Sequence, residues 1–208
     1  MTMSPVVGAV VALALLAVFG LLGFAWRAWL QRRRTGSTGF RGMNGRLGSA
    51  EWVAGLGFVT ALIVAVVGPV LQLSGVITPV SVLHAEWIQV AGIALAGLGI
   101  VLTVWAQLDM GESWRVGVDA SETTALVQTR VFGWVRNPIY TAMLIFDFGI
   151  ALVTPNFVTI AGLVLAIAAL ELQVRRVEEP YLLGKHGPAY RSYTANVGRF
   201  IPGVGLIR

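Results

Sequence analysis

The positively charged residues of this chain lie only in alternate polar stretches between its apolar runs, and this pattern restricts the fold more than any other feature. All fifteen Lys and Arg residues follow the first, third or last run, and the stretches around Gln72 to Glu86 and Thr154 to Asn156 contain none. Positive charge near span ends marks the cytoplasmic face of a membrane. The pattern therefore predicts an odd number of crossings, with the N-terminus outside and the C-terminus in the cytoplasm.

Five apolar runs approach the roughly 20 residues that a helix needs to cross a bilayer. They are Val6 to Leu30, Trp52 to Leu73, Trp87 to Leu108, Ile139 to Val153 and Phe157 to Leu172. The last two are short and are joined only by Thr154-Pro155-Asn156, so we expect a tight hairpin whose cytoplasmic ends extend into the flanking segments. The sequence thus predicts an all-α polytopic membrane bundle of about five transmembrane helices, with a cytoplasmic loop and a C-terminal helix.

The composition excludes several other classes of protein. The chain is 56% hydrophobic and 12% charged, with a mean hydropathy of +0.77, far from the soluble average. The net charge of +5 follows the membrane-orientation rule, so nucleic acid is not expected as a partner. There is no Cys, and His84 and His186 fall on opposite sides of the membrane, so we expect no metal site. The first run has no basic segment before it and no cleavage pattern, which indicates a retained span.

Small residues recur at helical spacing in three of the runs, as Gly57/Ala61/Ala65, Gly92/Ala96 and Gly162/Ala166. Such faces let neighbouring helices approach closely. They predict packing within the bundle and are also compatible with a homodimer.

Polar residues gather in the second half of the chain. We therefore divide it into residues 1–108, with three transmembrane helices and a basic cytoplasmic loop at 31–50, and residues 109–208, which we expect to hold the chemistry. Because the last two spans form a hairpin, the segment Arg136 to Tyr140 and the pair Glu178-Glu179 should meet at the cytoplasmic surface. The prediction is a site that lies half in lipid and half in water.

Each of these features also has an ordinary structural explanation. Asn137-Pro138 is typical of a helix start, where proline at the first position is favourable. Tyr140 alone is an ordinary interfacial aromatic residue. Glu178 and Glu179 are compatible with a solvated surface pair.

Taken together, the second half resembles the isoprenylcysteine carboxyl methyltransferase and phospholipid methyltransferase superfamily of membrane enzymes. The matching segments, in the family's order, are Met110 to Asp119, Ala125 to Val127, Arg136 to Tyr140, Glu178-Glu179, and Gly187, Tyr190, Tyr193, Val197, Arg199 and Pro202. About the last hundred residues are covered. The first of these segments is similar to bacterial members, so we expect the bacterial inner membrane as the location.

The resemblance implies S-adenosylmethionine as methyl donor, with S-adenosylhomocysteine as product. No Gly-x-Gly-x-x-Gly segment follows a strand in this sequence, so a dinucleotide-binding fold has no support. The expected cofactor-binding residues are Leu126, Val127, Phe132, Arg136, Asn137, Pro138, Ile139, Tyr140, Glu178, Glu179 and Tyr190. The family's substrate-facing arginine corresponds to Arg175 or Arg176, so we expect these two and Glu178 to be catalytic. The chain departs from the family at Asn137, where His is common, and at Arg130-Val131, where a Gly-Pro or similar turn is common.

The residue types suit such a ligand. Phe132, Tyr140 and Trp134 can stack or make cation–π contacts with a sulfonium, and Arg136 or Arg175 can hold a carboxylate. Glu178 can bind the amine or the ribose hydroxyls.

The acceptor's reacting group stays open. A carboxylate acceptor arrives as a nucleophile, whereas an amine or hydroxyl needs a base such as Glu178 or Glu171. Asp147 lies deep in an apolar run, where an ionisable group suggests either a functional or a packing role, and we assign it to the acceptor path. Trp114 and Arg115, before the main segment, can cover the site.

Our expectation is therefore a methyltransferase whose lipophilic acceptor enters from the bilayer, with membrane lipids around it. Two alternatives remain. Some membrane sterol reductases carry a similar C-terminal region and bind NADPH, for which Arg175, Arg176 and Lys185 can supply a basic cluster. A non-enzymatic membrane scaffold would use the same polar residues only in loops.

Overall fold

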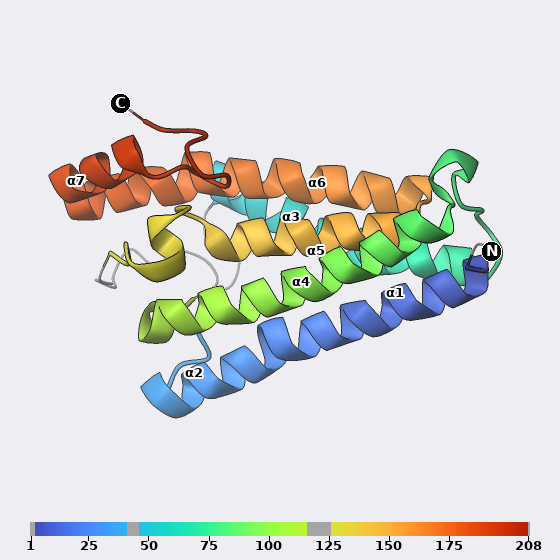
Figure 1. Ribbon diagram of the computed structural model, residues 1–208. Helices are drawn as coiled ribbons and strands as arrows, with labels where there is room; N and C mark the ends of the chain where they lie inside the picture. The colour runs from blue at the N-terminus through green and yellow to red at the C-terminus, as the bar shows by residue number, and fades with distance from the viewer. Residues whose placement is uncertain (1–2, 41–45, 116–125, 208) are drawn as a thin grey trace.

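The computed structural model describes residues 3–40, 46–115 and 126–207. These ranges contain helices and no strand, with one isolated bridge between Val135 and Gly198. The longer helices are α1 (Pro5–Phe19), α2 (Arg27–Thr35), α3 (Ala50–Leu73), α4 (Glu86–Met110), α5 (Pro138–Val153), α6 (Phe157–Gln173) and α7 (Glu179–Asn196). They lie side by side along one direction (Figure 1), which confirms the predicted all-α bundle.

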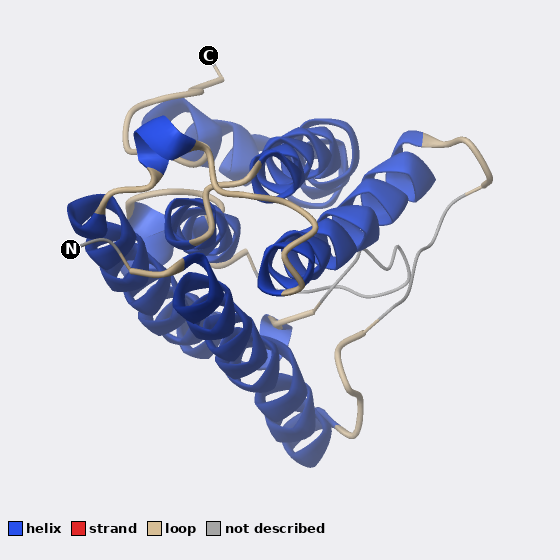
Figure 2. Ribbon diagram, turned by 90° about the vertical axis from the view of Figure 1, so that its right-hand side faces the viewer, coloured by secondary structure: helices blue, strands red, loops and turns tan. Residues whose placement is uncertain are grey.

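Short segments connect these helices. The π-helical segments η1 (Gly20–Trp26) and η5 (Val174–Glu178) join α1 to α2 and α6 to α7 without a break. Single 3-10 turns form η2 (Ser81–Leu83), η3 (Gly111–Ser113) and η4 (Arg130–Gly133). Figure 2 views the bundle from the end at which the N-terminus lies and shows the described helices gathered around one another.

Four helices are long and apolar enough to cross a membrane: Pro5–Thr35, Ala50–Leu73, Glu86–Ser113 and Phe157–Asn196. The remaining one, α5, has 16 residues and is therefore about 24 Å long, against a hydrocarbon core of about 30 Å. The last run extends into its flanking segment, as predicted, since α6 continues through η5 into α7. The fourth run extends into its flanking segment by one residue only, because α5 begins at Pro138.

The predicted hairpin is only partly correct. Thr154-Pro155-Asn156 does join α5 to α6, yet α5 packs chiefly against α4, and α6 chiefly against α3. Glycine permits a close approach of α5 to α4: a Cβ added at Gly149 would lie 2.5 Å from the backbone nitrogen of Ala96. The small-residue faces predicted from the sequence are thus used inside the bundle, and they give no support to a homodimer. The division of the chain into residues 1–108 and 109–208 stays a prediction. The contact between α4 and α5 joins these two parts.

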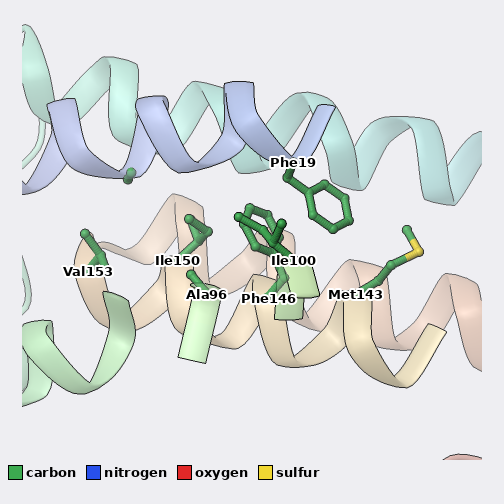
Figure 3. Packing of buried hydrophobic residues seen from close by; sticks show 8 residues of the cluster. Phe19, Ala96, Ile100, Met143, Phe146, Ile150 and Val153 are labelled. Atoms are coloured by element: carbon green, nitrogen blue, oxygen red, sulfur yellow. The ribbon is translucent and has the colours of Figure 1, made fainter. Parts of the chain in front are cut away.

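A core of large apolar side chains joins α1, α4 and α5 (Figure 3). Phe19 stacks on Phe146 with ring centroids 4.2 Å apart, and Ile100, Ile150 and Met143 surround this pair. Between membrane helices such contacts stabilise the bundle through van der Waals packing, because lipid is as apolar as these side chains. The core therefore fixes α5 against α1 and α4 directly below its first turn, where the polar segment begins.

The polar segments collect at one end of the bundle. Figure 1 shows α2, the start of α5, α7 and the C-terminus at the end opposite the N-terminus. This is the end for which the basic residues predict a cytoplasmic location, and that orientation stays a prediction.

Candidate active site

The C-terminal tail is bonded along its backbone to the start of α5. Arg136 N donates to Gly198 O at 2.8 Å, and Asn137 N donates to Arg199 O at 3.1 Å. The Asn137 side chain also donates to Arg199 O, at 3.1 Å, and does not cap α5. Pro138 does occupy the first turn, as a helix start requires. Asn137 thus ties the tail to the helix, a role beyond simple helix initiation.

A buried ion-pair cluster, Arg136–Glu179–Arg199, closes this junction. Arg136 Nη2 donates to Glu179 Oε1 at 2.8 Å, and Arg199 donates through Nε and Nη2 to both carboxylate oxygens at 2.8 and 2.9 Å. Arg136 also donates to the carbonyl oxygens of Val197 and Gly205. The hydrogen bond to Glu179 raises the pKa of Arg199 above its ordinary value, against the opposing effect of burial. Arg199 is therefore held as a cation, and the hydrogen bonds of both arginines lock the tail in place.

The neighbouring glutamate faces the other way. Tyr140 OH donates to Glu178 Oε1 at 2.6 Å, and Gln173 Nε2 donates to the same oxygen at 3.2 Å. Glu178 ends the π-helical segment η5, and π turns within α-helices occur frequently at functional sites. The segment Arg136 to Tyr140 and the Glu178-Glu179 pair thus meet, as predicted.

These groups line a cavity of about 510 Å³, within the size range of small-molecule sites. The predicted residues on its wall are Trp114, Arg115, Leu126, Val127, Phe132, Arg136, Asn137, Pro138, Ile139, Tyr140, Glu178 and Tyr190. Tyr193 also lines it, and its hydroxyl donates to Phe132 O at 2.5 Å. One cavity, with a mainly apolar wall, therefore collects most of the predicted cofactor residues.

Five predicted residues do not line this cavity: Arg175, Arg176, Glu179, Asp147 and Glu171. Arg175 Nε donates to Glu171 on the outside of the helix, where the arginine side chain is 57% exposed. Arg176 is exposed as well. The π-helical turn that directs Glu178 inward leaves both arginines outside, so the expected substrate-facing arginine is not found there. Arg115 reaches the cavity instead, with its guanidinium 5.7 Å from the Tyr181 ring.

The first half of the chain contributes a wall that the sequence did not indicate. Phe24, Phe40, Glu51 and Phe58 line the cavity from η1, the segment after α2, and α3. Phe40 lies 6.1 Å from the Trp114 ring in an edge-on contact. Gln107 and Gln173 were also missed. In the sequence these aromatic residues are indistinguishable from residues that face lipid, and only the spacing Gly55, Phe58, Val59, Leu62 along one face of α3 offered a signal.

Comparison with known proteins agrees with this architecture. The family model for phospholipid methyltransferases matches residues 87–189, which include α4, α5, α6 and most of α7. The chain carries a phospholipid methyltransferase region. This match confirms the resemblance predicted from the sequence. The region contains the Arg136–Tyr140 segment and Glu178-Glu179, whereas the cavity wall on η1 and α3 lies outside it.

Two individual proteins are also similar. The chain is 26% identical over 123 residues to the nickel-cobalt-cadmium resistance protein NccN of Alcaligenes xylosoxydans xylosoxydans, an alignment that covers 59% of this chain and 55% of that protein. The chain thus spans little more than half of this curated relative. The structure is similar to the eukaryotic intramembrane Ras methyltransferase ICMT (isoprenylcysteine carboxyl methyltransferase), with a TM-score of 0.62 and 22% identity over 95% of this chain and 67% of that one. The second likeness supports the fold of an integral membrane bundle.

Proposed function

We propose that this protein transfers a methyl group from S-adenosylmethionine to a lipophilic acceptor at the cytoplasmic face of the membrane. The observation that carries the proposal is the cavity in which Asn137, Tyr140 and Glu178 meet, inside the matched family region. The cavity is polar near Glu178 and apolar toward Phe58 and Leu62. The polar part of the wall therefore suits a water-soluble donor, and the apolar part suits a lipid.

The residues around the cavity fit a sulfonium nucleoside. Tyr140 and Tyr190 offer aromatic rings, and the Glu178 carboxylate can accept hydrogen bonds from an amine or from ribose hydroxyls. Arg115 can bind a carboxylate with charge assistance. Gln107 Oε1 is buried and accepts no hydrogen bond from the described residues, while Gln107 Nε2 donates to Gly23 O at 2.8 Å. An N–H or O–H group of a ligand can donate a hydrogen bond to this oxygen.

The alignment of methyl donor and acceptor accounts for most of the expected acceleration of methyl transfer. When bound, S-adenosylmethionine supplies a methyl group already activated by its sulfonium, so the protein chiefly has to align donor and acceptor. The ion pairs of Glu179 with Arg136 and Arg199 hold the Asn137 end of the cavity wall, and the hydrogen bond from Tyr140 fixes the Glu178 carboxylate. Arg136 then acts as a positioning residue, because both of its terminal nitrogens are already bonded inside the protein.

The basic residues do not favour the reductase alternative. Arg175, Arg176 and Lys185, which would have to bind a 2′-phosphate, are absent from the cavity wall, and Arg175 is paired with Glu171. We therefore retain the methyltransferase as the proposal.

Binding of two nucleotides to the purified protein in nanodiscs tests this proposal. S-adenosylhomocysteine should bind and NADPH should not, as measured by isothermal titration calorimetry. Glu178→Ala and Tyr140→Ala should each weaken S-adenosylhomocysteine binding, while the matched control Arg175→Ala, on the outside of the same continuous helix, should leave it unchanged. Binding of NADPH alone would refute the proposal. Incubation with lipid extract and radiolabelled methyl donor then identifies the acceptor.

A further inference from the structure

The cavity has a second wall that the matched family region does not include. It consists of Phe24 from η1, Phe40 after α2, and Glu51, Phe58 and Leu62 from α3, whereas the match begins at residue 87. If the matched region binds the methyl donor, as the proposed function requires, the space beside this second wall is left for the acceptor. The inference that follows rests on that proposed function.

Glu51 is the acidic group of this wall. It lies in the first turn of α3, where Ser49 Oγ accepts a hydrogen bond from Trp52 N at 3.2 Å and fixes the start of the helix. Glu51 is half-buried and lines the cavity, and no side chain or backbone group in the described ranges donates a hydrogen bond to it or forms an ion pair with it. By contrast, Glu178 and Glu179 both accept hydrogen bonds from protein groups. Glu51 is therefore a carboxylate that a ligand can use.

Below Glu51 the same face of α3 is apolar. Gly55, Phe58, Val59 and Leu62 follow at helical spacing and all line the cavity. Leu62 lies eleven positions after Glu51, which places these two ends of the wall about 16 Å apart along the helix axis. A carboxylate at the polar end of an apolar wall matches an amphiphile whose head group meets Glu51 and whose chain lies along α3.

The two walls carry different charged side chains in the described ranges: Arg115, Arg136 and Glu178 on the matched region, and Glu51 on the α3 wall. The arginines that line the described part of the cavity are Arg115 and Arg136. Arg136 is bonded to Glu179, and Arg115 lies over the ring of Tyr181 in α7. Neither belongs to the α3 wall, so the Glu51 carboxylate faces a ligand without a neighbouring cation on that wall. A head group that donates N–H or O–H bonds is favoured there, and a carboxylate head group is repelled.

We propose that Glu51 binds the head group of the methyl acceptor, and that this acceptor is an amphiphilic amine or alcohol with its chain along Phe58 and Leu62. In the transfer, the acceptor nitrogen or oxygen bonds to the methyl carbon while the carbon–sulfur bond breaks and leaves its electron pair on sulfur. The proton that the amine or alcohol loses goes to the Glu51 carboxylate. Glu51 is thereby assigned two roles: it binds the head group, which selects the class of acceptor, and it accepts the proton that the head group loses.

Binding of three probes of equal chain length tests this assignment: dodecylamine, dodecanol and dodecanoate, each radiolabelled, on protein in nanodiscs with empty nanodiscs subtracted. The wild-type protein should bind dodecylamine or dodecanol at least about 10-fold more tightly than dodecanoate, as expected for a hydrogen bond to a charged group. Glu51→Gln should remove this preference, and Glu51→Lys should reverse it toward dodecanoate.

Glu86→Gln is the matched control, because Glu86 lies in the first turn of α4, is exposed and is absent from the cavity wall. It removes the same helix-terminal charge and should leave all three affinities unchanged. Tighter binding of dodecanoate to the wild type, or the same order of affinities in Glu51→Gln, overturns the assignment. S-adenosylhomocysteine affinity is measured in parallel: it should be equal in wild type and Glu51→Gln. If the wild type does not bind S-adenosylhomocysteine, the proposed function is refuted. The assignment of Glu51 is tested independently of that result, since the three probes are measured without a methyl donor.

Discussion

Replacement of Glu179 by Ala tests whether the ion-pair cluster holds the cavity wall together. The carboxylate accepts three hydrogen bonds from two arginines, and the side chains of Arg136, Arg199 and Glu179 are only 2%, 10% and 10% exposed. Removal of the carboxylate leaves two guanidinium groups buried without their counter-ion. The tail from Val197 to Gly205 would then lose the charge that binds its arginine to the helix bundle.

The size of the effect follows from burial. Loss of one partner from a buried ion pair costs about 3–5 kcal/mol, because the remaining charge stays desolvated. Glu171→Ala is the matched control, since it removes a glutamate from the same continuous helix whose partner Arg175 is 57% exposed. Exposed pairs of this kind contribute about 0–1 kcal/mol. The free energy of unfolding should therefore fall by at least about 2 kcal/mol more in Glu179→Ala than in Glu171→Ala.

Two measurements check this difference. Denaturant unfolding in mixed micelles, followed by circular dichroism, gives the free energies of unfolding, and limited proteolysis reports release of the tail. Glu179→Ala should also weaken S-adenosylhomocysteine binding although Glu179 does not line the cavity, because Asn137 loses its bond to Arg199 O. Equal unfolding free energies in the two variants, with the tail equally protected, would refute the view that this cluster stabilises the site.

Two further substitutions probe the site and the bundle. Tyr140→Phe removes the 2.6 Å bond to Glu178 and should lower S-adenosylhomocysteine affinity by about 10-fold, since a hydrogen bond to a charged group contributes about 1.5–3 kcal/mol; unchanged affinity in calorimetry would remove this pair from the donor site. Gly149→Ala puts a Cβ 2.5 Å from Ala96 N and should destabilise the protein by about 1–3 kcal/mol. Gly97→Ala, where a Cβ meets nothing within 4 Å, should be neutral or slightly stabilising in the same unfolding assay.

The meeting of the Arg136 segment with Glu178 was predictable, but the predicted cause was incomplete. A short link between α5 and α6 led us to expect that their packing would bring the two segments together. In the structure, α5 and α6 each pack chiefly on another helix, and the tail bonds Arg136 and Asn137 to the region of Glu179. The tail is bonded to the start of α5 through the backbone carbonyl groups of Gly198 and Arg199. Backbone hydrogen bonds of this kind produce no hydropathy pattern in the sequence.

Side-chain direction was the least predictable part of the site. In four consecutive residues, Arg175 and Arg176 point outward, and only Glu178 reaches the cavity. The π-helical segment Val174–Glu178 sets these directions, and neither residue spacing nor charge reveals a π turn in a sequence. The aromatic wall at Phe58 was missed for a different reason, since a phenylalanine that faces lipid and one that faces a cavity satisfy the same hydropathy pattern.

The short α5 determines the depth of the proposed site. At 16 residues it is about 24 Å long, whereas the Pro5–Thr35 helix has 31 residues and extends about 46 Å. Figure 1 shows α5 beginning well short of the ends of α2, α4 and α7. The first turn of α5, with Tyr140, therefore lies below the rim formed by its longer neighbours, and η4 and the tail cover it from the aqueous side. A lipid head group at the level of the membrane surface can meet a soluble donor at this depth without leaving the bilayer, which a full-length α5 would prevent.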